Sequence, residues 1–241
     1  MASKVRLYVD HALGEGQMVP LSREQANYLF AVMRLPVGTT LSLINGKDGE
    51  WDAEVAEGNK RGGALRCIAQ TKPLQEPPDV WLIFAPIKKE RTAFIVEKAT
   101  ELGAARICPV ETEFTQSANR IKRDRLQAHA VEATEQCGGT FVPEVAELAK
   151  LSDVIKSWPE DRNLLFCDEG LVDETHSLED LPNGPWAILI GPEGGFSDAE
   201  RAQLTALSQS HAISLGPRIL RADTAAVAAL TLWQKHFGDW T

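Results

Sequence analysis

A proline-rich segment separates two stretches of chain with different residue patterns. Pro73, Pro77 and Pro78 lie within residues 73–79. Proline has no amide hydrogen and disrupts a helical turn, so this segment is expected to be an extended linker. The chain has 241 residues, which is enough for two domains. The sequence therefore predicts one domain at residues 1–72, a linker at 73–79 and a second domain at 80–241.

The first stretch has mostly the pattern of β-structure. Val5, Leu7 and Val9 alternate as in a half-buried strand. Ser22-Arg-Glu-Gln25 is typical of a capping box that opens a short helix. The remaining signals are the strand candidate Leu41–Ile44, the turn Asn45-Gly46 and the strand candidate Trp51–Val55. Strands joined by tight turns, with one helix, predict a small β-barrel.

The second stretch alternates strands and helices. Val80–Ala85 is an apolar run suited to a buried strand, and Glu90–Leu102 follows it with helical spacing and Gly103 as a stop signal. The other expected elements are strands at Arg106–Val110, Asn163–Cys167, Trp186–Ile190 and Ala212–Leu215, a helix through Leu126–Cys137 and a helix after each of the last two strands. This order predicts an α/β domain with a mainly parallel sheet.

Composition excludes several classes of protein. Hydrophobic residues make up 44%, without an apolar run of the roughly 18 residues that a membrane span requires. The N-terminus lacks the apolar core of a signal peptide, so we expect a cytoplasmic protein. The cysteines are scattered without a Cys-x-x-Cys pair, which indicates reduced thiols and no metal site; they are Cys67, Cys108, Cys137 and Cys167.

The net charge of −9 argues against a general binder of polyanions. The acidic excess lies in residues 73–241, whereas residues 1–72 are nearly neutral. A nucleic-acid enzyme of this composition would need local basic patches and would depend on shape more than on bulk charge.

Two glycine-containing loops are the strongest candidates for a ligand site. Leu189–Phe196 follows an apolar strand, and glycines at the carboxyl end of a strand let backbone approach a ligand. The loop is not Gly-x-Gly-x-x-Gly, and no Gly-Lys-Ser/Thr follows it, so a pyrophosphate or triphosphate site is disfavoured. A nucleoside without phosphates suits it better. The alternative is a tight strand-to-helix turn that binds nothing.

The second loop, Leu215–Thr224, repeats this arrangement. Gly216-Pro217 turns the chain, and Asp223 or Thr224 is expected to cap the apolar helix Ala225–Trp233. Arg218 and Arg221 bracket two aliphatic residues. The aliphatics could cover a flat base while an arginine holds a phosphate or a developing negative charge. The alternative is a pair of solvated surface arginines.

Together these loops closely resemble the two signature motifs of one family. Ile190-Gly-Pro-Glu-Gly-Gly-Phe196 and Leu215-Gly-Pro-Arg-Ile-Leu-Arg-Ala-Asp-Thr-Ala225 resemble those of the RsmE-type 16S rRNA (uracil-N3) methyltransferases, which belong to the SPOUT class. The resemblance extends over nearly the whole chain through Ala85–Lys89, Glu97–Gly103, Glu132–Gln136 and Val142–Glu144. Gly138-Gly139-Thr140 departs from the family, which often has an arginine after the Glu-Gln block, and this puts any RNA contact through that arginine in doubt.

The resemblance implies a fold, a donor and partners. The fold would be a SPOUT methyltransferase domain with a C-terminal trefoil knot, preceded by a PUA-like β-barrel that binds RNA. The methyl donor would be S-adenosylmethionine, the protein a homodimer, and the substrate 16S rRNA or the small ribosomal subunit. By resemblance, the cofactor-binding residues are Phe166, Asp168, Glu169, Leu189, Ile190, Gly191, Pro192, Glu193, Gly194, Gly195, Leu215, Gly216, Ile219, Leu220 and Arg221.

Methylation of uracil N3 generates negative charge on the ring oxygens when the N3 proton leaves, and a guanidinium would stabilise it. We expect Arg221 in this role and Arg218 second. Glu101 and Glu193 are the candidates for the base; the alternatives are a helix-surface position for Glu101 and a hydrogen bond to the donor ribose or within the loop for Glu193. The target base must be unpaired or flipped, because N3 lies on its pairing edge. Candidate RNA contacts are Arg6, Arg34, Lys88, Lys89, Arg120, Lys122, Arg123 and Arg125, although basic runs are often only solvated helix faces.

Three other functions remain open from sequence. A SPOUT enzyme acting on another RNA, such as tRNA, would carry the same donor loops. A non-catalytic RNA-binding protein would use the barrel alone and would not bind the donor. A flavin or nicotinamide enzyme on a doubly wound sheet would be expected to have the missing Gly-x-Gly-x-x-Gly motif.

Overall fold

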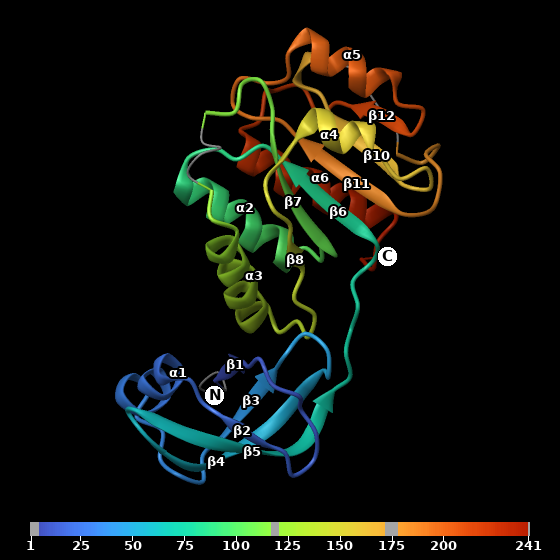
Figure 1. The fold of residues 1–241 in the computed structure, drawn as a ribbon. Helices are drawn as coiled ribbons and strands as arrows, with labels where there is room; N and C mark the ends of the chain where they lie inside the picture. Colours follow the sequence, from blue (N-terminus) through green and yellow to red (C-terminus); the bar gives the residue numbers. More distant parts are fainter. Residues whose placement is uncertain (1–4, 117–120, 172–177, 241) are drawn as a thin grey trace. The chain divides into compact units, whose positions relative to one another are not determined.

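The computed structural model describes residues 5–116, 121–171 and 178–240. The chain forms two compact units (Figure 1). The first unit is Met1–Glu76 together with Thr134–Val142, and the second unit is Pro77–Ala133 together with Pro143–Thr241. The sequence pattern did not indicate that residues 134–142 would group with the first unit.

The first unit contains a five-stranded sheet. Its strands are β1 (Arg6–Tyr8), β2 (Met18–Pro20), β3 (Thr40–Ile44), β4 (Glu50–Asn59) and β5 (Gly62–Lys72), in the order β1-β3-β4-β5-β2. β1 pairs with β3 in parallel and the other pairs are antiparallel. The expected capping box is present at Ser22, which starts α1 (Arg23–Asn27), and a π-helical segment, η1 (Tyr28–Val32), follows. Alternate strand residues such as Leu41, Leu43 and Val55 fill its core.

Arg6 joins β1 to the last turn of helix α3 (Arg123–Cys137) and to the glycine segment that follows it, within the first unit. Its Nε donates to Glu50 Oε2 at 2.8 Å, and its Nη atoms donate to the carbonyl oxygens of Thr134 (2.7 Å), Glu135 (2.8 Å) and Gly139 (2.7 Å). The carbonyl oxygen of Gly138 also accepts from Lys72 Nζ at 3.2 Å. The glycine segment that departs from the family motif thus accepts hydrogen bonds from Arg6 and Lys72 and helps to hold the first unit together.

The second unit is built on a parallel sheet. Its strands are β6 (Val80–Phe84), β7 (Arg106–Glu111), β8 (Glu144–Val145), β9 (Ala149–Lys150), β10 (Asn163–Cys167), β11 (Trp186–Ile190) and β12 (Ser210–Ile213). The order is β12-β10-β11-β6-β7-β8, with β9 paired to β7. The expected strands are present, but β12 ends before Ser214, because the Ser214 hydroxyl bonds to Gly216 and turns the chain. The short strands β8 and β9 were not foreseen.

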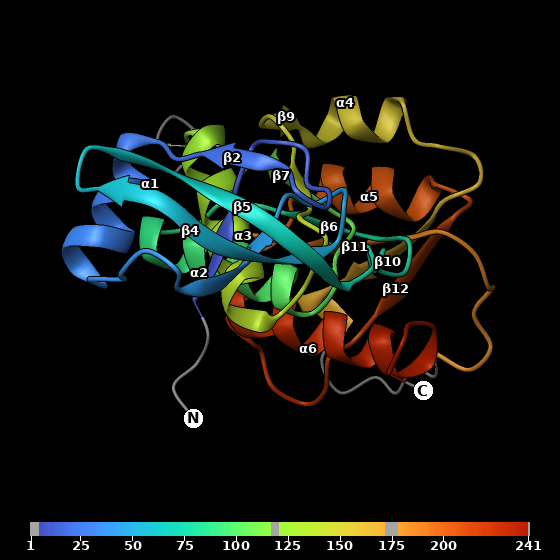
Figure 2. The ribbon, with the colours of Figure 1, turned by 90° about the horizontal axis from the view of Figure 1, so that it is seen from below.

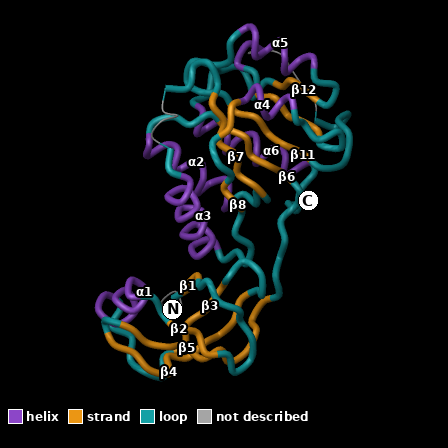
Figure 3. The backbone as a smooth tube through the Cα atoms, in the orientation of Figure 1, coloured by secondary structure: helices purple, strands orange, loops and turns teal. Residues whose placement is uncertain are grey.

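Helices cover both faces of this sheet, which explains why its strands are apolar on both sides. The helices are α2 (Lys89–Glu101), α3, α4 (Leu151–Lys156), α5 (Asp198–Ala206) and α6 (Ala222–His236), with a 3-10 turn, η3 (Glu169–Leu171), after β10. α2, α3 and α6 share one core cluster with the sheet, whereas α4 and α5 contribute to the cluster on the other face. Figures 2 and 3 show the strands between these two layers.

Helix α6 is tied to α2 at both ends. Near its start Asp223 forms an ion pair with Arg91 of α2. Near its end the buried Gln234 donates from Nε2 to the carbonyl oxygen of Leu102 at 2.7 Å. The sequence predicted that Asp223 or Thr224 would cap this helix, and this is wrong: Arg221 is the N-cap residue and makes no side-chain cap, because the Asp223 carboxylate is directed to Arg91.

Among the described residues, no helix is long and apolar enough to cross a membrane.

Candidate active site

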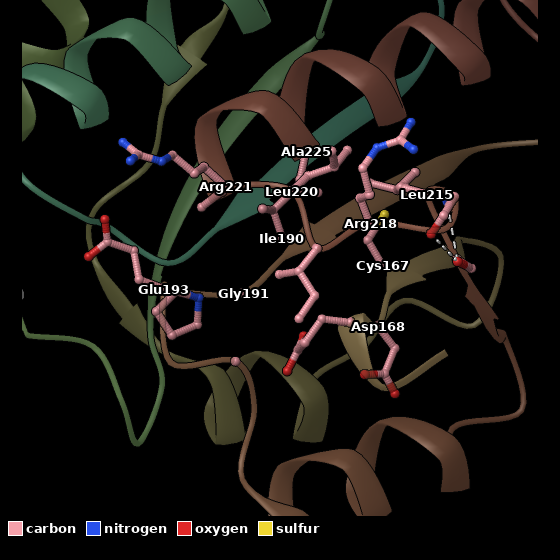
Figure 4. A pocket seen from close by; sticks show the side chains of 17 residues that line it. Cys167, Asp168, Ile190, Gly191, Glu193, Leu215, Arg218, Leu220, Arg221 and Ala225 are labelled. Atoms are coloured by element: carbon pink, nitrogen blue, oxygen red, sulfur yellow. Dashed lines mark hydrogen bonds between the residues drawn. The ribbon is translucent and has the colours of Figure 1, made fainter. Parts of the chain in front are cut away.

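The loops after β10, β11 and β12 meet at the carboxyl edge of the sheet. β10 lies between β12 and β11, so the three loops are neighbours although they are far apart in sequence. They enclose a cavity of about 210 Å³ (Figure 4). This is the edge at which open α/β sheets bind ligands.

The first wall of the cavity is Cys167, Asp168 and Glu169. Arg201 of α5 forms ion pairs with both carboxylates and donates from Nε to the carbonyl oxygen of Phe196 at 3.2 Å. It thereby fastens the first wall to the loop that forms the second. Burial raises the pKa of the Cys167 thiol to about 12, so this cysteine is neutral and not a nucleophile near pH 7.

The second wall is largely backbone, from Ile190 to Gly195. A Cβ atom at Gly191 would lie 2.7 Å from Cε2 of Phe196, so this position accepts only glycine without a shift. Gly195 has φ +70°, a conformation that disfavours side chains, and a Cβ there would collide with Glu169. The capping box at Ser197 then starts α5, as the sequence predicted.

The third wall runs from Ser214 to Arg221 and continues into Ala222 and Ala225 of α6. Leu215 and Leu220 present apolar surface and also pack against the core. Figure 4 shows the Arg221 side chain on the same side of the cavity as Glu193, while Arg218 extends to the opposite side. Neither arginine forms an ion pair within the described ranges, so their donors are available to a ligand.

The structure brings most of the predicted cofactor residues together, but not all of them. Phe166 and Leu189 are 1% exposed and belong to the core on the other face of the sheet. Gly194 is packed beside Phe114 and is also outside the lining. The predicted residues that line the cavity are Asp168, Glu169, Ile190, Gly191, Pro192, Glu193, Gly195, Leu215, Gly216, Ile219, Leu220, Arg218 and Arg221.

Four lining residues were not among the individually named cofactor residues: Cys167, Ser214, Ala222 and Ala225. Ala222 and Ala225 belong to the second motif, and Cys167 and Ser214 lie in the expected strands before the loops, but small or neutral side chains carry no chemical signal of their own. Glu101 must be withdrawn from the site, because it lies at the end of α2, outside the cavity lining, and bonds to Lys98 Nζ at 2.7 Å.

The predicted RNA contacts fall into different environments. Arg6 must be withdrawn, because its side chain is 14% exposed and its donors are used within the first unit. Arg123 donates from Nε to the carbonyl oxygen of Val145 at 2.9 Å. Arg34 is exposed, with φ 55°. Arg120 lies outside the described residues. The remaining four line a second cavity and are Lys88, Lys89, Lys122 and Arg125.

Comparison with known proteins decides the family. Residues 75–234 match the model of an RNA methyltransferase domain, and residues 21–65 match that of an RNA methyltransferase PUA domain. Ribosomal RNA small subunit methyltransferase E of Rickettsia conorii is 31% identical over 229 residues, which is 93% of each chain. This chain belongs to the ribosomal RNA small subunit methyltransferase E family.

Solved structures agree with this membership. The methyltransferase E of Neisseria gonorrhoeae, bound to S-adenosyl methionine, is 28% identical with a TM-score of 0.86, covering 99% of this chain and 100% of that one. A Legionella pneumophila protein solved with its cofactor SAM is 30% identical with a TM-score of 0.88 over the same shares. The expected fold class, a PUA-like domain before a SPOUT methyltransferase domain, is confirmed. The trefoil knot stays a prediction.

The described residues of this methyltransferase E family member were also compared with the arrangement that a metal ion requires. Within residues 5–116, 121–171 and 178–240, no group of three or more His, Cys, Asp or Glu side chains is arranged to hold a metal ion. Its polar groups are instead carboxylates, guanidiniums and backbone of the three loops.

Proposed function

We propose that this protein transfers a methyl group from S-adenosylmethionine to N3 of a uridine in 16S rRNA of the small ribosomal subunit. The observation that carries the proposal is the cavity in which all three carboxyl-edge loops meet, with Arg218 and Arg221 at its rim. The relatives' name supports the substrate, and the two solved relatives with bound S-adenosylmethionine support the donor.

The residues of the cavity fit this donor. Aliphatic side chains at Ile190, Leu215 and Leu220 offer apolar faces to a flat adenine ring. The backbone of the second wall can accept and donate hydrogen bonds to a ribose. When bound, the sulfonium supplies an activated methyl group and its own leaving group, so the protein's share is positioning.

Arg221 is the residue we propose as the stabiliser of charge on the target base. Its guanidinium lies at the rim of the cavity, where a base approaching the methyl group would arrive. As the N3 proton leaves, negative charge spreads to the ring oxygens, and a guanidinium can donate two hydrogen bonds to them. Arg218 is the second candidate for this role.

Glu193 is the base that we propose for removing the N3 proton. It lines the cavity and lies on the same side as Arg221. The proton would pass from N3 to its carboxylate while Arg221 holds the oxygens of the base. Glu101 has no part in this proposal, since its partner is Lys98.

The domains and assembly complete the proposal. Residues 1–72 form the RNA-binding PUA-like domain, residues 73–79 the linker and residues 80–241 the catalytic domain, of which residues 134–142 group with the first unit. The protein acts in the cytoplasm as a homodimer. Support for the dimer comes from apolar side chains that the single chain leaves exposed: Ile219 is 75% and Leu232 of α6 is 41% exposed. Light scattering coupled to size exclusion would test it, with a monomeric mass contradicting the dimer.

Two experiments test the function. Calorimetry should give measurable heat with S-adenosylmethionine, because the cavity needs no RNA to form; a complete lack of binding would exclude the donor. Mass spectrometry of rRNA from a strain that lacks this protein should show loss of 3-methyluridine. Persistence of that nucleoside at full level would refute the assigned product.

A further inference from the structure

The second cavity of the catalytic unit, here called the basic groove, lies between the first turns of α2 and α3. It has a volume of about 140 Å³ and is lined by Lys88, Lys89, Lys122 and Arg125. Ile87 and Leu126 form part of an apolar floor and are 5% exposed each. This space is large enough to admit a phosphate-sized group.

The charges of the basic groove are not balanced by the protein. None of the four cations forms an ion pair with an acidic side chain in the described part of the chain. Among the nearby acids, Glu97 lies 3.1 Å from His129 Nδ1 and Asp124 pairs with Arg123, while Glu90, exposed in the first turn of α2, forms no ion pair with the groove cations in the described part of the chain. Four unpaired cations around one cavity, in a chain of net charge −9, repel one another and attract an anion.

The basic groove lies close to the cavity between the loops after β10, β11 and β12, here called the donor pocket. The amide of Ala85 donates to the carbonyl oxygen of Ile190, a donor-pocket residue, at 3.0 Å. Lys88 follows three residues later, and three residues of chain span at most about 10 Å. On the other side, Arg91 of α2 pairs with Asp223, two residues after Arg221. A polymer that presents its base at Arg221 can therefore reach the basic groove with its own backbone.

We propose that the basic groove binds a backbone phosphate of the RNA strand that carries the target uridine. This inference rests on the proposed function for the identity of the RNA. Lysine and arginine side chains from two helix starts would surround the phosphate oxygens, and the helix N-termini add favourable potential. The groove then sets the register of the strand, while the donor pocket and Arg221 act on the base.

Removal of the charges is the first test. Lys89→Ala and Arg125→Ala should each weaken binding of a small-subunit rRNA transcript and make the plot of log Kd against log salt less steep by about 0.7. Lys156→Ala is the matched control, because Lys156 is on α4 with 77% side-chain exposure, outside the basic groove. Slopes of both groove variants equal to that of the control would overturn the proposal.

Filling the cavity is the second test, because it changes no charge. Ala93 lines the basic groove, and Ala93→Phe should occupy the space of the phosphate and weaken RNA binding several-fold. Ala128→Leu, at an exposed position of α3 outside the lining, is the matched control. Circular dichroism and donor affinity report whether the variant is folded. A folded Ala93→Phe protein with wild-type RNA affinity would overturn the proposal.

Two further measurements separate the sources of failure. Inorganic phosphate should compete with RNA only weakly. If inorganic phosphate binds tightly and the groove variants do not change the affinity for RNA, the basic groove is a site for small anions, and the proposal is overturned. Donor binding and methyl transfer by the wild-type protein are measured in parallel. If the wild-type protein binds the donor and transfers the methyl group, but the groove variants bind RNA as tightly as the wild type, only the inference about the basic groove fails. If the wild-type protein neither binds the donor nor transfers a methyl group, the proposed function fails.

Discussion

Arg6 and Arg221 lie in opposite surroundings, although the sequence made both candidates for contact with RNA. The Arg6 side chain is 14% exposed and gives its donors to Glu50 and to three carbonyl oxygens of residues 134–139. Arg221 is exposed at the rim of the donor pocket and has no ion pair among the residues that the structure describes. An arginine whose donors are already used stabilises the fold, whereas one whose donors are open is available to a ligand.

Substitution of Arg6 should have the largest effect on stability. Arg6→Ala leaves Glu50, whose side chain is 9% exposed, with only Thr71 at 2.8 Å and Lys72 Nζ at 3.8 Å, so the loss should approach the roughly 3–5 kcal/mol of a broken buried ion pair. Hydrogen exchange of the β3, β4 and β5 amides should report the loss in the first unit. Donor affinity should stay near the wild-type value. Hydrogen-exchange rates equal to those of the wild type would show that Arg6 has no structural role, and the contrast with Arg221 would then be wrong.

Substitution of Arg221 should have the largest effect on catalysis. Arg221→Ala is expected to lower the single-turnover rate of methylation about 10²–10³-fold, the usual cost of removing a donor to developing negative charge. The free energy of unfolding of this variant should be nearly unchanged, and it should partly retain its affinity for the donor. Arg218→Ala is the comparison variant, with a smaller expected loss. Methylation at the wild-type rate by Arg221→Ala would contradict the assigned role.

Acid should weaken the Arg6 network at a predictable pH. Burial acts to raise the pKa of Glu50, but hydrogen bonds from Thr71 and Arg6 outweigh it, and the pKa is lowered from 4.5. The carboxylate therefore contributes stability that is fully present above pH 4.5 and is lost as pH falls through the lower folded pKa. Glu50→Gln should flatten this part of the stability curve. An equally steep curve for that variant would assign the acid sensitivity to other groups.

The smallest effect is expected at Arg66. This arginine pairs with Glu54 at 3.0 Å, but the two side chains are 56% and 34% exposed. Arg66→Ala should therefore cost no more than about 1 kcal/mol in the same exchange experiment. A loss as large as that of Arg6→Ala would mean that burial does not separate structural from peripheral arginines in this unit.

Much of the architecture could be predicted because its signals are local. The proline segment, the capping boxes at Ser22 and Ser197 and the apolar runs of β10 and β11 each specify their own stretch of chain. The strand β12 was placed about two residues late, because the turn at Ser214 depends on a side-chain bond that apolar periodicity does not encode.

The candidate site was predicted less completely, for a geometric reason. Along a strand successive side chains face opposite sides of the sheet, so one residue decides whether a side chain reaches the pocket. Cys167 and Ile190 line the cavity, whereas their neighbours Phe166 and Leu189 face the opposite core. The role of Arg6 depends on carbonyl groups more than 120 residues away, as its sequence separation of 128 from Thr134 shows.

The double tie between α6 and α2 has a consequence for redesign. Asp223 holds α6 near one end and Gln234 holds it near the other, so the helix stays in place while the exposed residues 217–219 of the preceding loop can be varied. Ile219, at 75% exposure, contributes little to the folded state. Libraries that vary Pro217 and Ile219 and keep Leu215 and Leu220 can therefore explore analogues of the donor with bulkier transferable groups at little cost to the melting temperature.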